Sequence, residues 1–128
     1  MRSLRRRRPF PPRGSGMFKN YLSYQLALSF DRECRSLPLE PGPMHRLLKS
    51  SADMVRHFAQ ALHTSDGQDR SKNLFVALIC LRDCRETLDE QKIDAFEILG
   101  RYQVLHGRLE QLCLDAAGAE DGQLRMFG

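Results

Sequence analysis

The chain has 128 residues, of which 41% are hydrophobic and 28% charged, and this composition is typical of one globular domain rather than two. It contains no run of about 18 apolar residues, so we expect no membrane-spanning helix. The net charge of +4 comes from six arginines in residues 1–16, because residues 17–128 carry 14 basic and 16 acidic side chains. The folded part therefore lacks the overall basic charge that is typical of nucleic-acid-binding domains.

Residues 1–16 are rich in Arg, Pro and Gly, and we expect them to form a disordered basic tail. Three interpretations stay open. The tail is a basic arm that contacts phosphates, a solvated segment without a role, or a segment outside the native protein, whose start is then Met17. A twin-arginine export signal is not expected, because no apolar segment follows the arginines.

The first two helices are predicted over residues 18–36 and 43–63. In the first, an apolar residue recurs at every fourth position, which is typical of one buried face: Phe18, Leu22, Leu26 and Phe30. Three prolines and a glycine in residues 38–43 end this helix, and proline is favoured where the next one begins.

The third helix is predicted over residues 69–87, with Leu74, Phe75, Leu78 and Leu81 on its buried face, and the fourth over residues 89–115. Thr87 and Glu90 fit a capping box, which predicts that a very short connection joins the two as antiparallel neighbours. On the third helix, Arg82 and Glu86 are expected to form an i,i+4 ion pair. Residues 118–128 are expected to be a flexible C-terminal tail.

Four amphipathic helices with short connections predict an all-α, up-down-up-down antiparallel four-helix bundle over residues 17–117. The first and third helices carry more apolar residues than one buried stripe requires. This surplus indicates a second buried surface and therefore a homo-oligomer. The candidate interface residues are Tyr21, Tyr24, Val76, Ile79 and Cys80.

The sequence offers little for catalysis or cofactor binding. It has no P-loop, no dinucleotide-binding glycine motif, and no His with a Glu three residues before it, as a di-iron bundle would need. The four cysteines are expected to be reduced thiols of a cytoplasmic protein, since a zinc site would need two further ligands besides Cys80 and Cys84. We therefore predict no enzyme activity, no cofactor and no metal site.

Four short motifs occur in an order and spacing that resemble one known family. They are Tyr24–Ala27, Arg46–Ser51, Asp69–Lys72 and Ala77–Cys84. The sequence resembles, over about residues 18–114, the small four-helix-bundle family named after proteins encoded in intervening sequences of bacterial 23S rRNA genes. Several polar positions of the family pattern differ here: His57, Gln60, Ala61, Cys80 and Asp83.

The resemblance implies a ring-shaped homopentamer of bundles. It also implies a link to the accessory protein of diversity-generating retroelements, whose ring presents basic surface to nucleic acid and to a reverse transcriptase. Most of the family has no established biochemical activity, so the resemblance speaks to fold and assembly more than to function.

Two functions are weighed for this chain. The first is a non-enzymatic homo-oligomer that binds RNA, DNA or a ribonucleoprotein through basic surface residues. The second is a protein–protein scaffold or accessory subunit without a nucleic-acid role. The candidate nucleic-acid contacts are Lys19, Arg32, Arg35, Arg46, Lys49, Arg56, Arg70, Lys72, Arg82 and Arg85.

Overall fold

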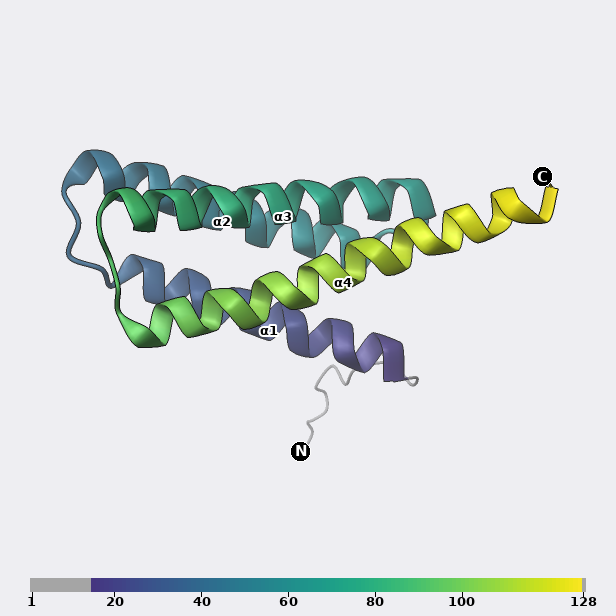
Figure 1. Cartoon of the computed structure of the whole chain (residues 1–128), viewed down its shortest axis with the longest axis horizontal. Helices are drawn as coiled ribbons and strands as arrows, with labels where there is room; N and C mark the ends of the chain where they lie inside the picture. Colours follow the sequence, from purple (N-terminus) through teal and green to yellow (C-terminus); the bar gives the residue numbers. More distant parts are fainter. Residues whose placement is uncertain (1–14, 128) are drawn as a thin grey trace, which may run out of the picture.

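The computed structural model describes the backbone of residues 15–127 and the side chains of residues 20–117. Within this range the chain forms four helices and no strand: α1 (Ser15–Arg35), α2 (Pro41–His63), α3 (Gly67–Glu90) and α4 (Phe96–Phe127). They run up, down, up and down, with the α1–α2 and α3–α4 connections at one end of the bundle and the α2–α3 connection at the other (Figure 1). The predicted all-α four-helix bundle is confirmed.

Each helix packs against its two neighbours around the bundle, and α2 and α3 share the most extensive contact. The buried side chains form one core that draws on all four helices. Phe30, Phe58, Leu81 and Leu105 each contribute a fully buried side chain from a different helix.

The face of α1 that points into the core agrees with the predicted ridge only in part: Phe30 is fully buried and Leu26 packs against the core, but Leu22 does not. The core positions are held by Ser23, Ala27, Phe30 and Cys34, whereas Leu22 is 39% exposed. The prediction was wrong for Leu22 because apolar residues surround much of α1, so the four-residue ridge was not its only apolar stripe. Three of the four inward positions carry small side chains, and the larger Tyr21 and Leu22 lie outside.

The boundary between α3 and α4 was also predicted wrongly. Thr87 is not a helix cap: it is buried inside α3, and its hydroxyl donates to the backbone oxygen of Asp83 at 3.3 Å. The helix ends instead in a Schellman motif, in which Ile93 N–H bonds Leu88 O at 2.9 Å and Lys92 N–H bonds Asp89 O at 3.0 Å. The connection therefore spans residues 91–95, which is longer than expected.

Both ends of the bundle domain also differ from the predicted bounds. The first helix begins at Ser15, inside the predicted tail, and the rest of that tail, residues 1–14, lies outside the described residues. The fourth helix runs to Phe127 instead of ending near residue 115. A single glycine such as Gly118 costs a helix only about 1 kcal/mol, too little to end it without a proline or a capping motif.

The turn after α3 offers a test of local backbone energetics. Lys92 has φ 56°, a left-handed conformation that glycine adopts more readily than lysine. We expect Lys92→Gly to raise the free energy of unfolding by roughly 0.5–1 kcal/mol in urea denaturation. The matched control, Lys72→Gly in the interior of α3, should lower it by about 1 kcal/mol. Destabilisation by both changes would contradict the argument.

Candidate functional site

Arg46, near the start of α2, contacts three carboxylates on one face of α3. Its guanidinium lies 3.1 Å from Asp83, 2.9 Å from Glu86 and 2.8 Å from Glu90. The hydrogen bond with Asp83, supported by the nearby carboxylates, raises the pKa of Arg46. These ion pairs join the beginning of α2 to the end of α3, and they engage one of the arginines that were predicted to contact phosphate.

Asp83 also accepts a hydrogen bond from the hydroxyl of Ser50 on α2. This bond, together with Arg46, holds the pKa of the Asp83 carboxyl below its ordinary value. Because the folded state favours the ionised form, Asp83 stabilises the bundle above the carboxyl's pKa in the unfolded chain, about 3.9. That contribution is lost as the pH falls through the lower pKa of the folded state.

A pH titration of stability can check this role. We expect the wild-type chain to be more stable than Asp83→Asn at pH 6, and the difference between them to shrink as the pH is lowered from 5 towards 2. The measurement is urea unfolding followed by circular dichroism at a series of pH values. A difference that stayed constant over this range would contradict the linkage.

Most of the other candidate basic residues are also paired with carboxylates. Lys49 and Arg56 both contact Asp53, at 3.1 and 2.8 Å, and hold its pKa below the ordinary value, chiefly through the hydrogen bond from Arg56. Three further pairs are Arg35–Asp31 at 3.0 Å, Arg82–Glu110 at 3.7 Å and Arg85–Asp89 at 2.9 Å. The predicted pair Arg82–Glu86 does not form, since Glu86 contacts Arg46 and Arg82 donates to His106 Nε2 at 3.1 Å.

The remaining candidates do not lie together. Among the described side chains, Arg32, Arg70 and Lys72 have no carboxylate partner, and the side chain of Lys19 lies outside the described residues. Arg32 is in the last turn of α1, whereas Arg70 and Lys72 are near the start of α3, at the opposite end of the bundle (Figure 1). These three residues therefore do not form a continuous basic stripe.

A groove of about 380 Å³ lies between α2 and α3. It brings predicted nucleic-acid contacts together with predicted interface residues. Its lining residues are Arg46, Lys49, Ser50, Asp53, Ile79, Cys80 and Asp83. Ile79 is 47% exposed, and Phe75, one turn earlier on the same face of α3, is 55% exposed. We call Phe75 and Ile79 the α3 outer ridge.

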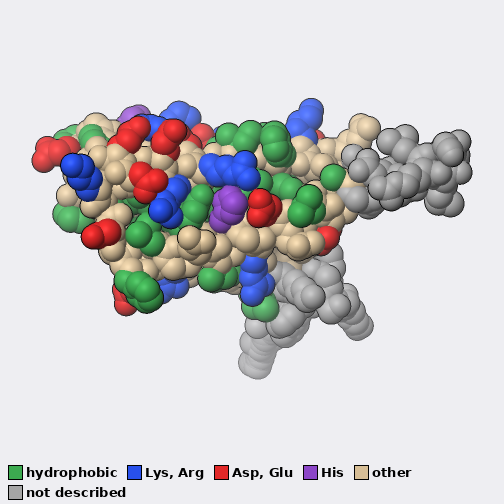
Figure 2. All heavy atoms as spheres, viewed as in Figure 1, with side chains coloured by type: hydrophobic (Ala, Val, Ile, Leu, Met, Phe, Trp, Pro, Cys, Tyr) green, Lys and Arg blue, Asp and Glu red, His purple; other side chains and the backbone are tan. Residues whose placement is uncertain are grey.

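The α3 outer ridge was only half predicted. Ile79 was named as an interface candidate, but Phe75 was assigned to the core and that assignment was wrong. The i,i+4 spacing of these two residues was a signal for a second apolar face. Hydrophobic side chains gather over part of α3 on the visible face, beside a region of mixed charge (Figure 2).

The other interface candidates lie in different surroundings. Tyr21 is 38% exposed, and Val76 and Cys80 are half-buried. Tyr24 packs edge-on against the buried Phe58, with ring centroids 5.7 Å apart, so it contributes to the interior of the bundle.

The thiols and His57 occupy structural positions. Burial raises the pKa of Cys34 to about 12 and also raises the pKa values of Cys80, Cys84 and Cys113. A raised pKa leaves a thiol protonated at neutral pH and therefore a poor nucleophile. Nδ1 of His57 donates to Oδ1 of Asn73 at 2.9 Å, which ties α2 to α3.

Comparisons with known proteins give no relative for this chain. No protein-family model matches it, and neither a curated protein nor a solved structure is significantly similar. The resemblance to the 23S rRNA intervening-sequence family thus stays a prediction.

None of the helices, as far as the structure describes them, has an apolar stretch sufficient to span a membrane. Among the described side chains, no group of three or more His, Cys, Asp or Glu is placed to hold a metal ion.

Proposed function

We propose that the chain is a non-enzymatic, homo-oligomeric four-helix bundle that acts as a protein–protein scaffold or accessory subunit. The observation that carries this proposal is the α3 outer ridge, where Phe75 and Ile79 expose about half of their surface one helical turn apart. We assign this ridge to self-association, because the surplus of apolar residues on α1 and α3 exceeds what one bundle core uses.

The charges around the ridge fit a protein interface better than a phosphate-binding surface. Arg46, Lys49 and Arg56 are each within 3.1 Å of a carboxylate, so their charges are largely neutralised within the bundle. A rim of paired charges around an apolar centre is typical of protein–protein interfaces. Phosphate binding needs cations that are free to replace counterions.

The sequence resemblance supplies two finer parts of the proposal. It favours a pentameric ring as the assembly and a reverse transcriptase or another ribonucleoprotein component as the partner. Within such an assembly, the bundle would supply binding surface while the partner performs the chemistry. The raised pKa values of the four thiols fit a chain without a nucleophilic cysteine.

The proposal is tested by comparing the double variant Phe75→Ser/Ile79→Ser with a matched control, Phe96→Ser/Val104→Ser. The control removes two hydrophobic side chains that are 89% and 50% exposed on α4. In sedimentation velocity, the ridge variant should shift from oligomer to monomer while the control keeps the wild-type distribution.

Two results would contradict the proposal. One is dissociation by the control variant but not by the ridge variant. The other is a wild-type chain that shifts RNA or DNA in a gel at low salt and loses this binding steeply as salt is raised, which would favour a phosphate-binding function.

A further inference from the structure

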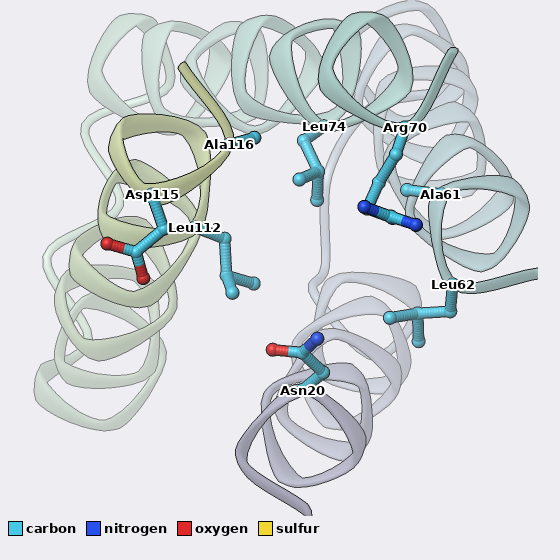
Figure 3. A pocket seen from close by; sticks show the side chains of 8 residues that line it. All are labelled: Asn20, Ala61, Leu62, Arg70, Leu74, Leu112, Asp115 and Ala116. Carbon is cyan, nitrogen blue, oxygen red and sulfur yellow. The ribbon is translucent and has the colours of Figure 1, made fainter. Parts of the chain in front are cut away.

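A cavity of about 270 Å³ lies at the end of the bundle where α2 connects to α3. It is bounded by all four helices, and the side chains of its walls surround a common space (Figure 3). The lining residues are Asn20 from α1, Ala61 and Leu62 from α2, Arg70 and Leu74 from α3, and Leu112, Asp115 and Ala116 from α4.

The walls of this cavity are mainly aliphatic. Leu62, Leu74 and Leu112 come from three different helices and enclose the space on three sides (Figure 3). Concave sites with apolar walls and a few polar groups are the usual form of small-molecule sites, and those for drug-sized ligands start at about 300 Å³. A cavity of this size therefore suits a smaller, largely apolar molecule.

Arg70 is the charged group of the cavity. It is half-buried, and its one described hydrogen bond runs from a terminal guanidinium nitrogen to the backbone oxygen of Thr64 at 3.3 Å. None of the described carboxylates pairs with it, although six other arginines form such pairs: Arg35, Arg46, Arg56, Arg82, Arg85 and Arg101. A guanidinium has five N–H donors, so Arg70 keeps donors for a ligand.

The two other polar residues of the cavity are compatible with an anion at Arg70. Asp115 lies on the opposite wall, where it accepts a hydrogen bond from Gln111 at 2.8 Å, and its carboxylate is turned away from Arg70 (Figure 3). The amide of Asn20 points into the space between Leu62 and Leu112 (Figure 3). It offers a further donor near the apolar walls.

We propose that this cavity binds a small unbranched monocarboxylate, a fatty acid with a chain of about eight carbons. The carboxylate is held by Arg70, because a planar guanidinium binds a carboxylate in bidentate geometry and such charge-assisted bonds are strong in a partly desolvated site. The alkyl chain lies against Leu62, Leu74 and Leu112. This inference is independent of self-association through the α3 outer ridge.

A second groove lies beside the cavity. It has a volume of about 560 Å³, lies between α1 and α4, and shares Asn20, Leu112 and Asp115 with the cavity. The two spaces therefore adjoin each other at these three residues.

The proposal is tested by isothermal titration calorimetry of the full chain with three probes of equal chain length: octanoate, octanol and octylamine. We expect octanoate to bind more tightly than the other two. Arg70→Gln should weaken octanoate binding roughly ten- to hundredfold, since it removes a charge-assisted hydrogen bond, and leave octanol binding unchanged. The matched control is Arg32→Gln, which removes another arginine without a carboxylate partner among the described residues at the far end of α1; it should leave both affinities unchanged.

A second variant guards against loss of fold in Arg70→Gln. Ala116→Leu adds volume inside the cavity and keeps the arginine, so it should weaken octanoate and octanol alike while the thermal melt stays cooperative. The proposal is overturned if octanoate gives no binding heat, if octanol or octylamine binds as tightly as octanoate, or if the folded Arg70→Gln and Ala116→Leu variants bind octanoate like the wild type.

Discussion

Phe58→Ala is expected to lower the free energy of unfolding by about 3–5 kcal/mol, measured by urea denaturation. Phe58 is fully buried in the core on α2, and its ring meets Tyr24 of α1 edge-on at 5.7 Å. The truncation removes the transfer free energy of the ring and leaves a space that four packed helices can fill only in part. This is a large share of the roughly 5–15 kcal/mol by which single domains are typically stable.

The matched control for this change is Phe96→Ala. Phe96 is 89% exposed at the start of α4, so the same chemical truncation creates no cavity and should change the free energy of unfolding by about 0.5 kcal/mol or less. Equal losses in the two variants would contradict the assignment of Phe58 to the core.

Ser51→Ala is expected to lower the free energy of unfolding by about 1–3 kcal/mol. Ser51 is fully buried on α2, and its hydroxyl donates to a carboxylate oxygen of Asp31 on α1 at 2.6 Å. The side chain of Asp31 is only 13% exposed, so water replaces the lost hydrogen bond poorly. After the substitution, the described ion pair of Asp31 with Arg35, at 3.0 Å, would remain.

The control for the buried hydroxyl is Ser29→Ala. Ser29 accepts an exposed hydrogen bond from Arg32 at 3.2 Å within α1, and water can replace that bond. Its removal should change the free energy of unfolding by about 0.5 kcal/mol or less, because alanine also favours helix. A loss in Ser51→Ala no larger than in Ser29→Ala would show that the Ser51–Asp31 bond contributes little.

The sequence was sufficient to predict the four helices, but not to predict which face of each helix is buried or where each helix ends. Periodic apolar residues identify a helix, yet a helix with apolar residues around most of its surface, such as α1, leaves the choice of inward face to tertiary packing. Thr87 and Glu90 fit a cap locally. In the structure Thr87 is buried within α3, and the Schellman motif at Lys92 and Ile93 ends the helix after Glu90.

The candidate site was less predictable because its decisive contacts join distant parts of the chain. Local spacing predicted the pair Arg82–Glu86, whereas Glu86 pairs with Arg46, forty residues earlier. Such contacts depend on the register of α2 against α3, which no local pattern encodes. The cavity at Arg70 combines residues from all four helices, so no local sequence motif predicts it.

Light scattering coupled to size-exclusion chromatography of the wild-type chain tests the central claim most directly. The chain has a mass of 14.7 kDa, so self-association predicts a particle mass that is a multiple of this value, with five copies favoured by the sequence resemblance. A single species of 14.7 kDa at all protein concentrations would contradict the claim. The α3 outer ridge would then not be a surface for self-association.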